Sequence, residues 1–60
     1  MPDDSERLLP VEVVAEVLRA HPETIRRMMR EGRLPAVKHH GKWLIRRGDF
    51  DAWLRKNEQQ

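Results

Sequence analysis

The hydrophobic and polar positions of the chain follow the period of an α-helix in three places. The first is residues 10–20, where apolar side chains cover most of the circumference and the polar ones form a narrow stripe of Glu12, Glu16 and Arg19. This pattern predicts a helix with Pro10 at its first position, where no backbone N–H is needed. Its apolar sector is broad, so we expect two elements of the fold, or another subunit, to cover it.

A second helix is predicted over residues 22–31, after a short break at 20–21. Pro22 forces the restart, because a proline inside a helix costs about 3 kcal/mol. Ile25, Met28 and Met29 share one face, which we interpret as core rather than as a methionine patch for a partner. The opposite face carries Glu23, Arg26, Arg27 and Arg30. Gly32 is placed to end the helix in a left-handed conformation.

The remaining segments predict a β-hairpin over residues 36–46 and a third helix. In the hairpin a glycine stands where the chain must reverse, and the expected inward side chains are Val37, Trp43 and Ile45. In the third helix Asp49 lies in the first turn, and Phe50, Trp53 and Leu54 form an apolar stripe. We expect the three aromatic side chains of the sequence, which are Trp43, Phe50 and Trp53, in one small core.

The length of 60 residues allows a single domain. We assign residues 1–8 to a disordered leader, 9–55 to the domain and 56–60 to a frayed tail. A domain of this size has little room for a substrate cleft with a positioned acid and base, so we expect no enzyme. The absence of cysteine excludes disulfides, thiolate zinc sites and thiol nucleophiles.

No apolar run is long enough for a membrane span, and the acidic start lacks the features of a signal peptide. We therefore expect a cytoplasmic, nucleoid-associated protein, and the starting methionine and polar end are typical of a complete chain. His39 and His40 are neighbours on a predicted strand and would point to opposite faces, while His21 lies in another element. We expect no metal site and no cofactor, and a histidine of the hairpin would contact phosphate or water.

Charge is distributed unevenly along the chain. Residues 1–23 carry a net charge of −4, whereas residues 24–48 carry +7. Such a cationic stretch on a nearly neutral protein favours a polyanionic partner, either nucleic acid or an acidic membrane surface. From charge alone, a solvated charged face is an equally good interpretation. The order helix, tight corner, basic helix and basic hairpin favours nucleic acid, because a winged helix-turn-helix needs those parts in that order.

Five segments carry a resemblance to a known family, namely residues 9–15 (LPVEVVA), 24–28 (TIRRM), 30–37 (REGRLPAV), 43–45 (WLI) and 50–54 (FDAWL). They resemble the excisionase and MerR-type winged helix-turn-helix DNA-binding domains, over about residues 8–55. The resemblance implies a mainly α fold with a small β-hairpin, a winged helix-turn-helix that consists of three helices and a wing. It also implies that the helix beginning at Pro22 reads the major groove of DNA.

The sequence departs from the family at the corner between the first two helices. The family usually has a glycine and a capping serine or threonine there, where this chain has Arg19 and His21. Histidine is a poorer N-cap, so we expect a less firmly fixed corner. Glu23 replaces a residue that is often basic, and it would either accept a hydrogen bond from a cytosine N4 or hold Arg27 in place.

These observations predict a small protein that binds double-stranded DNA, as an excisionase-like recombination directionality factor or a compact transcriptional regulator. Helix 22–31 would read the major groove, and hairpin 36–46 would contact the backbone or the minor groove. The predicted DNA-binding residues are Glu23, Thr24, Arg26, Arg27, Arg30, Lys38, His40, Lys42 and Arg47.

Other partners are also predicted. A single module covers only about 600 to 1,000 Å², so we expect a dimer or a cooperative array on DNA, and a recombinase or another protein partner stays open. The alternative is a protein-interaction adaptor that uses the apolar face of helix 10–20 together with the basic patch.

Overall fold

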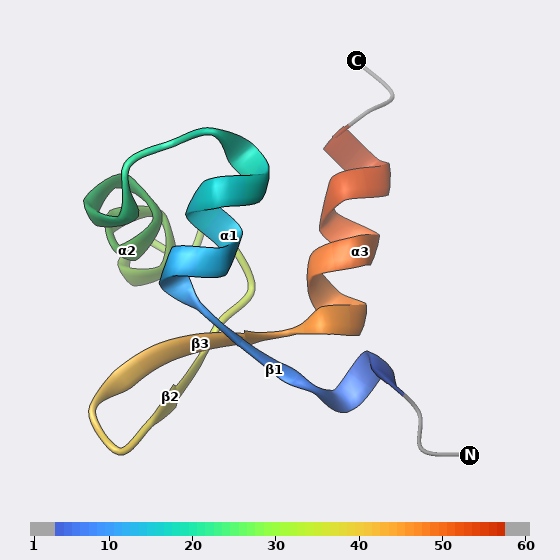
Figure 1. The fold of residues 1–60 in the computed structure, drawn as a ribbon, viewed down its shortest axis with the longest axis horizontal. Helices are drawn as coiled ribbons and strands as arrows, with labels where there is room; N and C mark the ends of the chain where they lie inside the picture. The colour runs from blue at the N-terminus through green and yellow to red at the C-terminus, as the bar shows by residue number, and fades with distance from the viewer. Residues whose placement is uncertain (1–3, 58–60) are drawn as a thin grey trace.

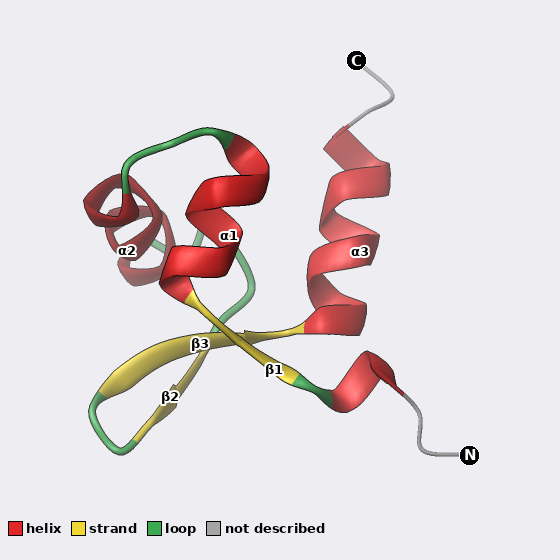
Figure 2. Ribbon diagram, viewed as in Figure 1, coloured by secondary structure: helices red, strands yellow, loops and turns green. Residues whose placement is uncertain are grey.

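A computed structural model describes residues 4–57 of the chain. In chain order its elements are η1 (Asp4–Glu6), β1 (Leu8–Pro10), α1 (Val11–Leu18), α2 (Pro22–Arg30), β2 (Val37–His39), β3 (Lys42–Arg46) and α3 (Arg47–Asn57). Figure 1 shows α1 and α2 side by side, with α3 standing apart from them. In the same view, coloured by element type in Figure 2, the three strands lie below α1, α2 and α3.

The strands form one antiparallel sheet in the order β1-β3-β2. Leu9 of β1 lies opposite Ile45 of β3, so β1 is a third strand that the sequence pattern did not predict. Pro10 is tolerated as its last residue because β1 is an edge strand. Pro10 is consequently the N-cap of α1 and not its first helical residue, which corrects the predicted start of that helix.

The start of the chain has more structure than the predicted leader. Residues 4–8 contribute η1 and the first position of β1, which corrects that prediction for these residues, and residues 1–3 lie outside the described part. η1 packs close to the start of α3, where a Cβ placed on Gly48 would lie 2.9 Å from the Cβ of Ser5. At the other end Lys56 and Asn57 are helical rather than frayed, and residues 58–60 of the predicted tail are not described.

One small core joins all three helices to the sheet. Its buried side chains are Val11, Val14, Ala15, Ile25, Met29, Leu34, Ile45 and Phe50. Met29 confirms the core interpretation of the methionine pair, and the half-buried Met28 packs against the same cluster. Phe50 is buried as predicted, whereas Trp43 and Trp53 are only half-buried at the edge of the core.

The hairpin differs from its prediction in the direction of one side chain. Val37 pairs with Leu44, while Trp43 and Ile45 alternate with Leu44 along β3. Because neighbouring side chains on a strand point to opposite faces, Val37 lies on the face opposite to Trp43 and Ile45. The prediction that Val37 points inward with these two residues is therefore wrong.

The corner between α1 and α2 is closed without glycine or serine. Arg19 adopts the left-handed conformation (φ 55°), and the Ala20 N–H donates to the Ala15 carbonyl at 2.9 Å. A left-handed residue other than glycine costs about 1 kcal/mol, and these backbone hydrogen bonds offset that cost. His21 caps α2 in spite of its low rank as an N-cap, because its Nδ1 accepts the Glu23 N–H at 3.2 Å.

The end of α2 has the predicted left-handed glycine. Gly32 has a φ of 76°, its N–H donates to the Met29 carbonyl, and the Arg33 N–H donates to the Met28 carbonyl. These two hydrogen bonds make a Schellman motif, which fixes where the recognition-helix candidate stops. With three helices and the hairpin β2–β3 as a wing, the predicted winged helix-turn-helix fold is confirmed.

Candidate nucleic-acid interface

The outward face of α2 is anchored by the side chains on its opposite face. Ile25 is fully buried and Met29 nearly so. Successive residues of a helix are rotated by roughly 100°, which places Arg27 and Arg30 in the sector turned away from those anchors and Arg26 at the edge of that sector. Arg27 and Arg30 are exposed, and neither forms an ion pair within residues 4–57. Two guanidinium groups are thus presented to solvent from a helix with a fixed orientation.

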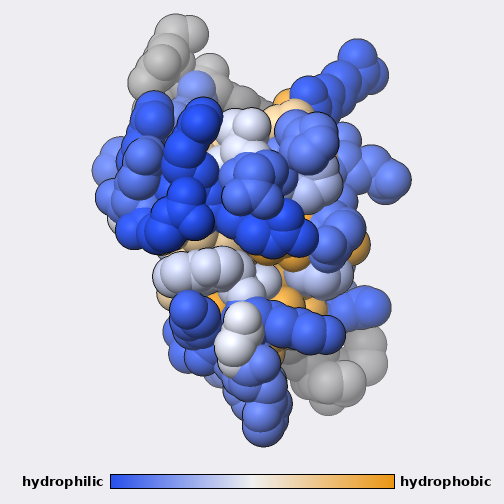
Figure 3. All heavy atoms as spheres, turned by 90° about the vertical axis from the view of Figure 1, so that its left-hand side faces the viewer, coloured by the Kyte–Doolittle hydropathy of each residue, from blue (hydrophilic) through white to orange (hydrophobic). Residues whose placement is uncertain are grey.

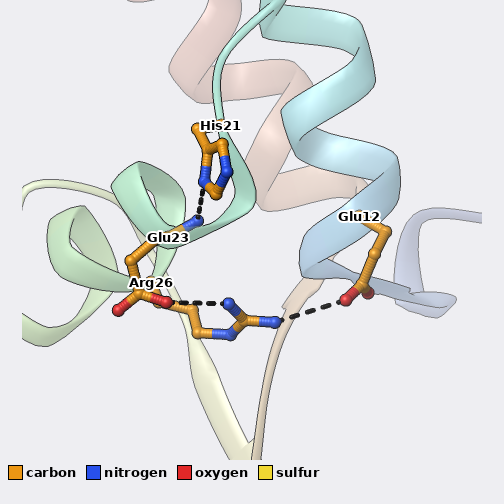
Figure 4. Close-up of polar contacts among 4 residues, drawn as sticks. All are labelled: Glu12, His21, Glu23 and Arg26. Atoms are coloured by element: carbon orange, nitrogen blue, oxygen red, sulfur yellow. Dashed lines mark hydrogen bonds and ion pairs between the residues drawn. The ribbon is translucent and has the colours of Figure 1, made fainter.

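Arg26 has a different environment. Its Nη1 donates to Glu23 Oε1 at 3.0 Å, and its Nη2 donates to Glu12 Oε2 at 3.3 Å. Figure 4 shows this side chain extending from α2 toward α1, with its guanidinium between the two carboxylates. Glu23 therefore holds Arg26 and not Arg27, which corrects the predicted pairing.

Glu12 is a site residue that sequence analysis missed. Its position on the polar stripe of α1 gave no sign of a partner, since Arg26 lies 14 residues further along the chain. Helical period shows which residues share a face of one helix, whereas only the corner between α1 and α2 determines which faces meet.

The remaining residue in the first turn of α2, Thr24, is half-buried, and its N–H donates to the His21 carbonyl at 2.9 Å.

The wing presents a second group of cations. Lys38 and Lys42 are exposed, and the Lys38 ammonium lies 4.9 Å from the ring centroid of Trp43. His40 and Gly41 form a two-residue turn with φ of 52° and 76°, which is the combination of a type I′ hairpin turn. His40 lies in the turn and not on the strand. The centroids of the His39 and His40 rings are therefore only 4.1 Å apart, so the prediction that the two side chains point to opposite faces is wrong.

Arg47 lies apart from the cations of the wing. It is the first residue of α3, at the end of β3 that is remote from the turn. Its guanidinium pairs with Asp4 at 3.0 Å and with Asp51 at 3.9 Å. The structure thus separates Arg47 from the wing residues with which the sequence pattern grouped it, and its role is to tie η1 to α3.

A groove of about 320 Å³ separates the basic face of α2 from the wing. Its lining comes from the start of α1, from α2 and from the hairpin, and consists of Pro10, Val11, Glu12, Arg26, Gly41, Lys42, Trp43 and Leu44. Figure 3 faces this side of the molecule and shows two hydrophilic areas, over α2 and over the hairpin, separated by a paler band. α2, with its exposed Arg27 and Arg30, and the wing, with its exposed Lys38 and Lys42, therefore lie on the same side of the fold.

A second, more apolar groove of about 250 Å³ lies between α1 and α3. Val13 and Val17 contribute to it and are 40% and 54% exposed, respectively. Val11, Val14 and Ala15 of α1 enter the core, and the half-buried Leu18 packs against it. α2 and the strands β1 and β3 pack against α1, so two elements of the fold, α2 and the sheet, cover most of its apolar sector as expected, while Val13 and Val17 remain exposed at this groove.

Two other kinds of feature are absent from residues 4–57. Histidine, aspartate and glutamate side chains do not gather there in threes close enough to bind a metal ion. The helices of this part of the chain also lack the length and the apolar run that crossing a membrane requires.

Comparison with known proteins adds one finding. Residues 8–58 match the model of a family described as the helix-turn-helix domain. No curated protein and no solved structure matches the chain. The match spans both helices of the corner, the wing and α3, so it includes α2 and the wing, which carry the exposed cations of the candidate interface.

Proposed function

Since the chain belongs to the helix-turn-helix domain family, we propose that it binds double-stranded DNA through α2 and the wing. In this family of folds the second helix of the corner enters the major groove while the first crosses the backbone. The observation that carries the proposal is the pair of exposed arginines, Arg27 and Arg30, on the face of α2 opposite to the buried Ile25. The protein acts as a binding module, without catalysis.

Each element has its own role in this proposal. Arg27 and Arg30 contact base edges, because guanidinium groups on an inserted helix match the acceptors of guanine. Glu23 accepts from an exocyclic amine with the oxygen that Arg26 leaves free, and Thr24 contacts the backbone at the start of α2. Lys38, His40 and Lys42 contact phosphates next to the wing.

The biological role follows from the size of the interface. A single module of this kind buries too little surface for tight binding, so copies act in pairs or in arrays on neighbouring sites. An excisionase-like recombination directionality factor and a compact transcriptional regulator would both work through such assemblies. A recombinase or another protein bound nearby would add further contacts.

One observation favours a second candidate, a protein-interaction adaptor. The exposed Val13 and Val17 border an apolar groove on a side of α1 that does not line the groove beside the wing. An apolar segment of a partner protein would fit between two helices in this way. In that case the basic residues would contact an acidic protein rather than DNA.

A salt titration of duplex binding separates the two candidates. Binding that neutralises Z phosphates weakens with salt along a log–log slope of about −0.9Z. With about three to five phosphate contacts from α2 and the wing, the expected slope is about −3 to −4.5. The measurement is the dissociation constant for a labelled duplex across a range of salt concentrations. A slope near zero would favour the adaptor.

A further inference from the structure

The groove between α1, α2 and the wing has a cation on each of two walls. Arg26 stands on the α2 side, and Lys42 stands on the wing side, next to the backbone of Gly41. The third wall is the start of α1, where the N-cap Pro10 supplies no side-chain hydrogen bond to the first turn. Two cations and a helix start attract an anion.

An anionic group of the protein itself already occupies part of this groove. Glu12 belongs to the first turn of α1 and lines the groove, and its Oε2 lies 3.3 Å from Arg26 Nη2. Figure 4 shows the guanidinium stretched between Glu12 and Glu23. Arg26 therefore faces two carboxylates, and any further anion that approaches it meets the charge of Glu12.

If DNA binds as proposed, its backbone passes next to the groove between α1, α2 and the wing. When the second helix of the corner lies in the major groove, the first helix crosses the backbone, and the wing lies beside the recognition helix. A phosphate near the start of α1 then reaches the groove that Arg26 and Lys42 border. On the basis of the proposed function, we propose that this groove seats one backbone phosphate between Arg26 and Lys42, and that Glu12 is the resident anion that the phosphate displaces.

The exposure of the two partners permits the exchange. The side chains of Arg26 and Glu12 are 39% and 66% exposed, and ion pairs in such surroundings are weak. Glu12 meets the guanidinium through a single oxygen at 3.3 Å, whereas a phosphate seated in the groove can accept two parallel hydrogen bonds from the fork of the arginine. Once displaced, Glu12 takes up a cation from solution, which offsets part of the counterion release from DNA. Glu12 thus lowers affinity for every duplex and flattens the salt dependence.

Glu12→Gln tests this site, with Glu16→Gln as the matched control. Both changes remove one negative charge from an exposed position of α1, but Glu16 lies one turn further on and does not line the groove. For a random-sequence duplex at low salt, Glu12→Gln is expected to raise affinity about fivefold and Glu16→Gln less than about twofold. The log–log salt slope should become steeper by up to about 0.9 for Glu12→Gln and stay unchanged for the control.

A second variant addresses the opposite wall and does not depend on the first. Lys42→Gln is expected to lower affinity for the same duplex and to make the slope shallower by about 0.9. Equal effects of Glu12→Gln and Glu16→Gln, or weaker binding by Glu12→Gln, would overturn the assignment of Glu12. An unchanged slope for Lys42→Gln would overturn the phosphate seat. Failure of the unaltered protein to bind any duplex is a different result, which refutes the proposed function itself.

Discussion

Arg27→Ala is expected to leave a protein that still binds duplex DNA but has lost most of its preference for one sequence. Arg27 is exposed on the outward face of α2 and forms no ion pair among residues 4–57, so its guanidinium is available to a base edge. A bidentate arginine–guanine contact contributes about 1 to 3 kcal/mol of discrimination. Its loss reduces the preference for the selected site over random duplex by about 5-fold to 150-fold.

Lys42→Ala is the matched control for that variant, since it removes one cation from the wing instead of from the helix. It is expected to weaken cognate and random duplexes alike, because a phosphate contact carries no sequence information. The measurement is selection of bound duplexes from a random pool, followed by affinities for the selected and the random sequence. Equal losses of site preference in both variants would contradict the division between a reading helix and a positioning wing.

Ile25→Ala is expected to remove a large part of the stability of the fold. Ile25 is fully buried, and truncation of such a side chain costs about 2 to 5 kcal/mol. A chain of 60 residues has a total stability of only about 3 to 9 kcal/mol. Far-UV circular dichroism during a urea titration measures the loss, and DNA binding should fall in parallel because α2 loses its anchor.

Val17→Ala is the control for the core variant. Val17 is 54% exposed on α1, so its truncation should change the free energy of unfolding by no more than about 0.5 kcal/mol. Should Ile25→Ala unfold at nearly the same urea concentration as Val17→Ala, the anchoring of α2 by Ile25 would be wrong. The same comparison shows whether the exposed valine contributes to folding at all.

The part of the interface that is local in sequence could be predicted from the sequence. Pro22 and Gly32 mark the two ends of α2, and the spacing of Ile25 and Met29 fixes which face enters the core. The direction of Arg27 and Arg30 follows from these, because all of them lie on one short helix. A helix-turn-helix with a basic second helix can therefore be predicted from the sequence alone.

The parts that depend on contacts distant in sequence could not be predicted in this way. β1 is too short to show the alternation of polar and apolar residues that is typical of a strand. It is a strand only because it pairs with β3, where Leu9 lies opposite Ile45. The face of Val37 depends on which two residues form the turn, and a shift of one residue reverses it. Arg47 pairs with Asp4, which is 43 residues away in the sequence, and Glu12 pairs with Arg26, which is 14 residues away. Only the folded chain brings these partners together.

Amide chemical-shift mapping during a duplex titration tests the central claim most directly. If α2 and the wing bind DNA, the largest shifts fall on the segment from Arg26 to Arg30 and on the turn at His40 and Gly41. Amides of Val13 and Val17, beside the apolar groove between α1 and α3, should shift little. Large shifts confined to these valines, with an unperturbed α2, would contradict the account.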